Sequence, residues 1–326
     1  MTGVSAAADL GVTTAVIGRA GGITGDAVAA ADAAASAAGV RVRAVGGPAE
    51  LEAVHRLFEE IRPSGGSVPV TRELLCAMAN AGGYIAGAFD EGDLVGACVG
   101  FFGPPPDEIL HSHIAGVPAR ARRRGIGFAL KTHQRAWALL RGVTDVSWTF
   151  DPLVRRNAYF AIGKLAAVPV EYLRDFHGRA DGVVNGGGDT DRLLVRWRLN
   201  TSEVAAACHG RRRDGDARAA GTAGAVAGPG EAPGTWRLPE RMDGPAVIIT
   251  VPDDVEVLRR SDPARAADWR GAVREALGGL LAEGWRVTGF DRTGWYTLGR
   301  EDGSWGPPAS RPGTPARHGR PGPGWA

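Results

Sequence analysis

Apolar and polar positions follow regular patterns in two blocks of the chain, and the first block begins near residue 41. An apolar run predicts a strand at 40–45. The segment 48–61 carries its apolar residues at helical spacing, with a proline in the first turn, which predicts an amphipathic helix. A second helix is expected at 71–80, where Thr71 is a suitable N-cap. Further apolar runs predict three strands, at 83–90, 94–102 and 109–117.

After residue 117 the pattern changes to alternating helices and strands. Helices are expected at 125–141 and 157–167, and strands at 145–150, 168–173 and 192–199. This order predicts an α/β protein of the α+β type, in which helices flank a mixed, mostly antiparallel central sheet. We assign residues 41–199 to this core.

The second block, 241–300, has the pattern strand, helix, strand, strand. A unit of this size has little core of its own. We therefore expect a C-terminal βαββ extension that completes or extends the first sheet.

Three other regions contain few large apolar side chains. Residues 1–40 are rich in Ala and Gly, residues 200–240 in Ala, Gly and Arg, and residues 301–326 in Pro and Gly. Such segments bury too little surface to offset the entropy of ordering. They predict a disordered arm, a flexible insertion and a disordered tail.

Charge and cysteine content narrow the functional classes. The formal net charge of +2 argues against a protein-wide field that would gather nucleic acid or a membrane surface. Three distant cysteines, Cys76, Cys98 and Cys208, fit neither a disulfide framework nor a C-x-x-C metal site. The first forty residues lack a secretion-type pattern, and no apolar window is long enough to span a bilayer. We expect a soluble cytoplasmic protein.

One stretch, residues 111–142, combines a strand, a basic loop and the start of a helix. The strand ends at Val117, three arginines occupy 122–124, and glycines stand at 125 and 127. The free backbone N–H groups and positive dipole end of a helix favour a phosphate, and glycine lets it approach closely. The pattern is neither the dinucleotide fingerprint nor a Walker loop.

The run Arg122-x-x-Gly125-x-Gly127 resembles the acyl-CoA pyrophosphate loop of the GNAT acetyltransferase superfamily. The order of elements over 41–199 agrees with that fold, and an asparagine, Asn157, opens the helix after the next strand, as it does in the superfamily. The resemblance implies an acetyl-CoA or other acyl-CoA co-substrate and no metal. The cofactor-binding residues that it implies are Val117, Arg122, Arg123, Arg124, Gly125, Ile126, Gly127 and Asn157. A solvated loop with a simple glycine turn is the alternative.

The resemblance also implies direct attack of an amine on the thioester, which calls for a base. His111 and His113 are two residues apart on a strand, so both face one side of the sheet, and either could take the amine proton. The alternatives are a hydrogen-bonded core histidine, or a His-x-His metal site, for which no third ligand is evident. Asp151 is the third catalytic candidate, and a turn residue before Pro152 is the alternative.

Four residues are candidates for substrate binding. Trp148 and Phe150 share one face of a strand and could line an acyl or acceptor pocket, or pack in the core. Arg270 and Arg274, one helical turn apart, could hold a substrate carboxylate, or belong to a solvated helix face.

The superfamily's tyrosine acid has no counterpart at the expected position. Aligning from Asn157 places Lys164 there, aligning on the helix end places Ile162 there, and Tyr159 falls about a turn too early. We interpret the chain as an acyl-CoA-dependent N-acyltransferase acting on a small-molecule amine. The alternatives are an enzyme that acts on a CoA thioester without amine transfer, such as a decarboxylase, and an inactive acyl-CoA-binding module. The acceptor, the acyl chain and the oligomeric state, a homodimer included, stay open.

Overall fold

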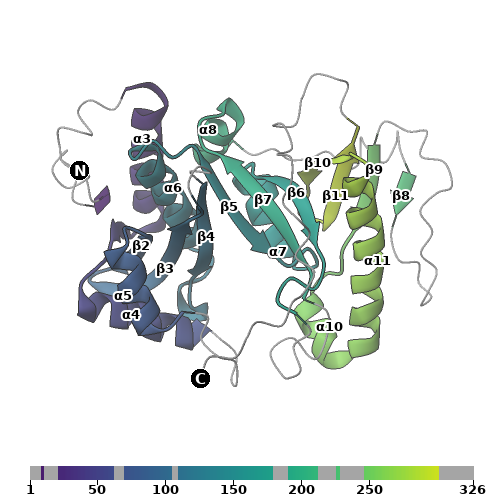
Figure 1. Cartoon of the computed structure of the whole chain (residues 1–326), viewed down its shortest axis with the longest axis horizontal. Helices are drawn as coiled ribbons and strands as arrows, with labels where there is room; N and C mark the ends of the chain where they lie inside the picture. Colours follow the sequence, from purple (N-terminus) through teal and green to yellow (C-terminus); the bar gives the residue numbers. More distant parts are fainter. Residues whose placement is uncertain are drawn as a thin grey trace.

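The computed structural model of the chain describes residues 9–10, 21–61, 70–104, 109–178, 190–211, 225–227 and 246–300 (Figure 1). The elements of its first part are α3 (Gly22–Ala38), β1 (Arg41–Ala44), α4 (Pro48–Ile61), α5 (Arg72–Asn80), β2 (Tyr84–Asp90), β3 (Asp93–Phe102), β4 (Ile109–Gly116), the 3-10 turn η1 (Ala119–Ala121) and α6 (Ile126–Leu139). The later elements are β5 (Asp145–Phe150), α7 (Arg155–Ala158), the π-helical η2 (Tyr159–Lys164), β6 (Val168–Leu173), β7 (Arg192–Arg198), α8 (Ser202–Cys208), β8 (Ala225–Ala227), β9 (Ala246–Thr250), α10 (Val255–Ser261), α11 (Pro263–Ala282), β10 (Arg286–Phe290) and β11 (Trp295–Gly299).

Seven strands form one sheet in the order β1-β2-β3-β4-β5-β7-β6. Every neighbouring pair is antiparallel except β4 and β5, which are parallel. This confirms the expected mixed, mostly antiparallel sheet. The pairing of β4 with β5 covers only residues 109–111 against 145–147. Beyond these residues the two strands have no ladder between them, which creates an opening inside the sheet.

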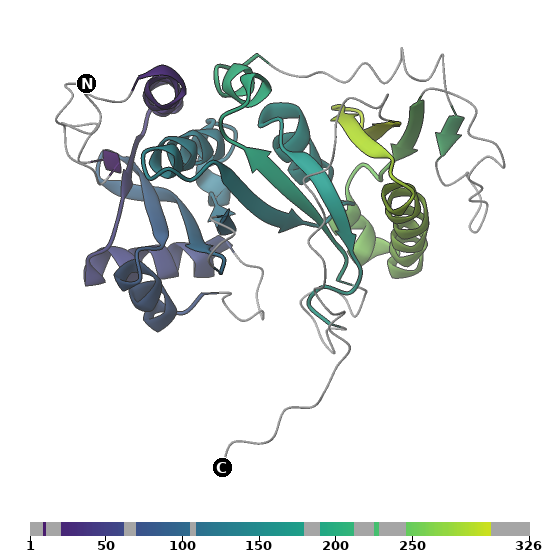
Figure 2. The same cartoon turned by 45° about the horizontal axis from the view of Figure 1, so that its top comes forward.

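Helices cover both faces of the sheet, as the views in Figures 1 and 2 show. On one face α4 and α5 bury apolar side chains such as Val54, Phe58 and Leu75 against Ile85 and Val99. α3 and α6 cover the other face, where the largest core cluster lies. The predicted cap of α5 is confirmed, because the Thr71 hydroxyl accepts a hydrogen bond from the Leu74 N–H at 3.3 Å.

The prediction of a disordered arm over 1–40 is wrong for residues 22–38. They form α3, which packs along α6 through small side chains, including the buried Ala27, Ala30 and Ala31. Alanines bury little area each, but they let two helices approach closely, and composition alone does not reveal that neighbour. An ion pair between Asp26 of α3 and the fully buried Arg135 of α6 ties the two helices together.

The C-terminal block does not extend the main sheet, as we had expected. Its strands form a separate four-stranded sheet in the order β10-β11-β9-β8, with α10 and α11 beside it (Figure 1). The buried residues of this block belong to the same core cluster as those of the main sheet. Among them are Ile249, Leu280, Trp285 and Tyr296.

The insertion predicted over 200–240 is also partly structured. Thr201 caps α8 by accepting a hydrogen bond from the Val204 N–H at 3.4 Å, and β8 pairs in parallel with β9. The remainder of that insertion and the predicted tail, 301–326, lie outside the described residues. The helix expected from Asn157 begins two residues earlier and continues as η2. No helix among the described residues has the length and apolar content needed to cross a membrane.

Candidate active site

The opening between β4 and β5 contains a cavity of about 260 Å³. It is lined by residues 112–115 of β4, residues 148–150 of β5, Lys131 of α6, Asn157 of α7 and Phe160 of η2. The register of β4 against β3 shifts between Ile114 and Ser112, so His113 is an extra, bulged residue. The short β4–β5 ladder and this bulge together keep the strands apart and expose side chains that a regular sheet would cover.

The predicted phosphate loop lies at the start of α6. Gly125 takes a left-handed conformation, with φ of 89°, which favours glycine, and α6 begins at the next residue. The N–H groups of Phe128 and Ala129 donate to the Gly125 carbonyl at 3.0 Å, whereas those of Ile126 and Gly127, the first two of the helix, have no preceding helical carbonyl to bond. Gly127 follows in the first turn, where a Cβ would come no closer than 3.9 Å to the Phe160 ring. The sequence therefore folds locally as expected for an anion-binding helix start.

The arginines of this loop have different environments. Arg124 donates to the Asp90 carboxylate at 2.7 Å and lies against the Ala38 and Gly39 carbonyls at the end of α3. It thus anchors the loop to its neighbours, which departs from the predicted phosphate contact. Arg122 and Arg123 are exposed, and the Arg122 Nε donates to the Val117 carbonyl at 3.4 Å.

The two histidines lie on the sheet face opposite Ser112. Their ring centroids are 6.3 Å apart, and both rings pack against Phe101, at 5.1 Å for His111 and 5.7 Å for His113. His113 is exposed and lines the cavity, whereas His111 is half-buried. Burial, followed by the charges of His113 and Lys131, lowers the pKa of His111, so this imidazole is neutral at pH 7.

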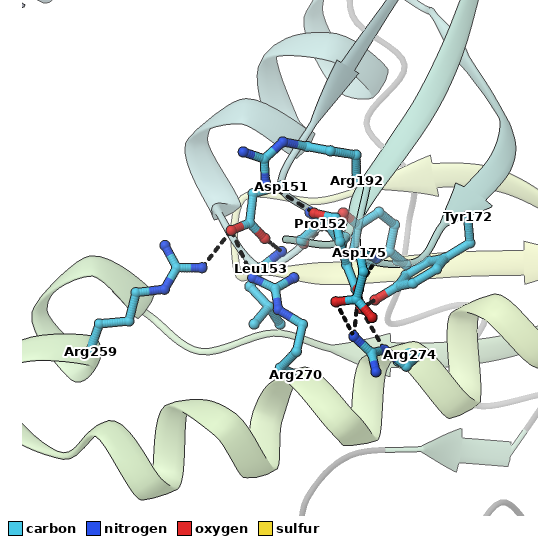
Figure 3. A network of polar contacts seen from close by, with 11 residues as sticks. Asp151, Pro152, Leu153, Tyr172, Asp175, Arg192, Arg259, Arg270 and Arg274 are labelled. Carbon is cyan, nitrogen blue, oxygen red and sulfur yellow. Dashed lines mark hydrogen bonds and ion pairs between the residues drawn. The ribbon is translucent and has the colours of Figure 1, made fainter. Parts of the chain in front are cut away.

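Asp151 lies in a buried cluster of opposite charges (Figure 3). Its Oδ2 accepts from Arg259 at 2.5 Å and Arg270 at 2.7 Å, and its Oδ1 accepts from the Leu153 N–H at 3.0 Å. Burial alone would raise the pKa of Asp151, but the charges of Arg270 and Arg259 hold it at about 2. A carboxylate that binds a proton so weakly and has both oxygens engaged is a poor base. In this structure Asp151 joins α10 and α11 to the end of β5.

Arg270 and Arg274, the candidates for holding a substrate carboxylate, bind carboxylates of the chain itself in the same region. Arg270 is 5 % exposed and bonds Asp151, while Arg274 makes two bonds to Asp191, at 2.6 and 2.8 Å (Figure 3). The Tyr172 hydroxyl also donates to Asp191, at 2.8 Å. Both arginines thus hold α11 against the end of β5 and the start of β7, and their guanidinium groups are engaged by carboxylates of the chain itself.

Comparison with known proteins identifies a family for the region that contains the cavity. Residues 51–163 match the model of the acetyltransferase (GNAT) family. The chain contains a GNAT acetyltransferase domain. A comparison with the curated proteins gives no match.

Several solved structures resemble the GNAT part of the chain at low identity. An N-acetyltransferase from Staphylococcus aureus has 16 % identity and a TM-score of 0.41, and it covers 49 % of this chain and 99 % of its own. A diaminobutyrate acetyltransferase from Paenibacillus lautus, in complex with L-2,4-diaminobutyric acid and coenzyme A, has 20 % identity and a TM-score of 0.39, covering 50 % of this chain and 97 % of its own. Identities this low do not transfer a substrate from one protein to another.

The aromatic residues Trp148 and Phe150 line the cavity of the GNAT domain, as the pocket hypothesis requires. Tyr159 does not, since its hydroxyl accepts from Arg292 Nε at 2.8 Å, near the second sheet. Ile162 is buried in the core. No tyrosine lines the cavity, so no described tyrosine occupies the place of the superfamily's acid.

Sequence reasoning missed one residue of this site, Lys131. Its helical position lies off the apolar stripe of α6 (Ile126, Leu130, His133, Trp137 and Leu140), where side chains are usually solvated. α6 lies between α3 and the sheet, however, and residues 129–138 are buried all round the helix. The one available signal is composition, because the chain contains only two lysines, Lys131 and Lys164, among its 38 Lys and Arg residues.

Proposed function

We propose that the chain transfers an acyl group, most simply acetyl, from acyl-CoA to the amine of a small molecule. The observation that carries this proposal is the opening between β4 and β5 within a GNAT domain, whose cavity is lined by Phe160. The Phe160 ring is also the nearest neighbour of a Cβ built at Gly127, at the start of α6. Three cysteines that are all free thiols are compatible with the cytoplasmic setting expected from the sequence.

The residues present fit a CoA thioester. The N–H groups of the first turn of α6, with Arg122 and Arg123 beside them, would hold the pyrophosphate. Gly125 and Gly127 would let the pyrophosphate approach the backbone closely, because neither carries a Cβ that would stand between them. Asn157 would contact the pantetheine arm where it enters the cavity.

The histidines supply the base in this proposal. His111 is neutral at pH 7, and His113 opens onto the cavity, so either could accept the proton of the attacking amine, directly or through a water. His111→Ala and His113→Ala should leave CoA affinity unchanged. With an accepted amine, loss of the true base should lower turnover by about 10²-fold or more.

Calorimetric titration with CoA and acetyl-CoA tests the cofactor site. The variant Gly127→Val places a branched side chain at the helix start, at a position without positive φ, and should weaken binding at least tenfold. The matched control is Gly271→Val on α11, where an added Cβ meets nothing within 4 Å. It should bind as the wild type does.

Absence of binding by the wild-type protein would overturn the proposal. Release of CO2 from malonyl-CoA without any amine would replace amine transfer by decarboxylation.

A further inference from the structure

A buried amine faces the cavity from α6. The Lys131 side chain is 3 % exposed overall, yet it lines the cavity together with Ser112, Trp148 and Asn157. Its Nζ donates to the Ser112 hydroxyl at 3.0 Å and to the side-chain oxygen Oε1 of Gln134 at 2.5 Å. It lies 4.1 Å from the centroid of the Trp148 ring. These contacts fix the position of the amine at the opening between β4 and β5.

Among the described residues, no carboxylate compensates the charge of this amine. Within the described part of the chain, Lys131 makes no ion pair, and the titratable groups that act on it are Cys98 of β3, His111 of β4 and Cys208 of α8. Burial lowers its pKa to about 8, against smaller opposing effects of the two thiols. An uncompensated buried cation is costly, and an apolar residue would fill this place at lower cost.

The choice of lysine is also informative. Of the 38 Lys and Arg residues, all but two are arginines, including those of the buried cluster around Asp151. Arginine stays protonated under any ordinary condition, whereas a buried lysine can release and regain a proton near neutral pH. The position that faces the cavity therefore carries a basic side chain able to exchange a proton.

The proposed reaction needs an acid at the cavity. Expulsion of CoA leaves a sulfur anion, and among the described residues that line the cavity there is no tyrosine to protonate it. Among the side chains that line the cavity, Lys131 combines burial, a proton to give and a hydrogen-bonded orientation.

We propose that Lys131 is the proton donor to the departing thiolate of CoA, an inference that rests on the proposed acyl transfer. The nitrogen of the attacking amine forms a bond to the thioester carbonyl carbon. When the carbon–sulfur bond then breaks, its electron pair goes to the sulfur, and the ammonium of Lys131 transfers one proton to it. The products are the amide, the CoA thiol and the neutral Lys131 amine. The proton that the attacking amine loses passes through a histidine to solvent, and Lys131 regains one from solvent, so the protons balance.

The first experiment measures the titration of the thiol of bound CoA, and needs no amine acceptor. Thiolate absorbance is recorded against pH for saturating CoA, and the spectrum with desulfo-CoA, which lacks the sulfur, is subtracted. A cation within about 4–6 Å lowers the pKa of an acidic group by about 1–3 units. We expect the thiol to titrate at least about one unit lower in the wild type than in Lys131→Met.

Lys164→Met is the matched control, because Lys164 is the other lysine of the chain and does not line the cavity. It should leave the thiol titration at the wild-type value. Equal titration in the wild type and Lys131→Met would overturn the role of Lys131 while leaving CoA binding, and so the proposed function, intact. Failure of the wild type to bind CoA would overturn both.

A second measurement avoids any substitution of Lys131. Protein labelled with 13C-lysine has two lysine signals, which Lys164→Met assigns. Coupling between two titrating groups is reciprocal, so a thiolate beside Lys131 must raise the pKa of the amine by as much as the amine lowers that of the thiol. The Lys131 signal should titrate at least about one unit higher with CoA than with desulfo-CoA, and identical titrations would overturn the proposal.

Discussion

Two regions of the molecule bury charge, and they do so in opposite ways. Around Asp151 and Asp191, arginines from α10 and α11 meet carboxylates at 2.5–2.8 Å, which joins the C-terminal elements to the main sheet (Figure 3). Lys131 is as deeply buried but has only neutral partners. A paired cluster holds elements together, whereas an unpaired ionisable group beside a cavity is suited to exchange a proton.

This difference shows that charge and position along the sequence do not by themselves identify a catalytic or binding residue. Asp151, Arg270 and Arg274 are attractive catalytic or binding candidates because they are charged and follow strands or share a helix face. Each of them is paired with an opposite charge of the chain, so these residues stabilise the fold. Nothing in the sequence pattern singles out Lys131, whereas its burial beside the cavity makes it the stronger candidate.

The largest expected effect comes from breaking the paired cluster. Arg270→Met removes one of the two arginines hydrogen-bonded to the buried Asp151 and should lower the free energy of unfolding by about 3 kcal/mol, measured in urea. Arg260→Met, on the exposed side of α10, should change it by less than about 0.5 kcal/mol. Lys131→Met, which removes an uncompensated charge, should be neutral or stabilising. If Lys131→Met lowered the free energy of unfolding as much as Arg270→Met does, the charge of Lys131 would be stabilising, and the two regions would not differ.

Acid should act on the paired cluster. The pKa of Asp151 is lowered from 3.8 to about 2 in the folded protein, so the stability that it contributes is complete above about pH 4 and is lost as pH falls toward 2. Between pH 5 and 2 the wild type should lose on the order of 2 kcal/mol more than Asp151→Asn. Urea unfolding at each pH measures this. Parallel curves for the two proteins would show that Asp151 titrates normally.

Alkaline pH should increase the stability of the folded protein through Lys131, whereas acid decreases it through Asp151. The pKa of its amine is lowered from 10.5 to about 8, so the unfolded chain binds more protons between these values and stability rises with pH. The difference in unfolding free energy between the wild type and Lys131→Met should shift in favour of the wild type by about 1 kcal/mol from pH 8 to 9. A flat difference would mean that Lys131 is not titrating there.

The smallest effect concerns a single neutral donor in the paired cluster. Tyr172→Phe removes the hydrogen bond to Asp191 at 2.8 Å but leaves both bonds from Arg274. The unfolding free energy should fall by about 0.5–1.5 kcal/mol. A loss as large as that expected for Arg270→Met would mean that Tyr172, and not Arg274, makes the main contribution to holding Asp191.

The sequence by itself determined the order and type of most elements, the cap at Thr71, the glycine start of α6 and the resemblance to the GNAT superfamily. These features are local, because strand and helix periodicity, capping and left-handed glycine depend on neighbours along the chain. Only the tertiary structure decided that the alanine-rich α3 packs on α6 and that the C-terminal strands form their own sheet. It also decided which charges are paired and which face the cavity, since partners distant in sequence set the burial and protonation of a side chain.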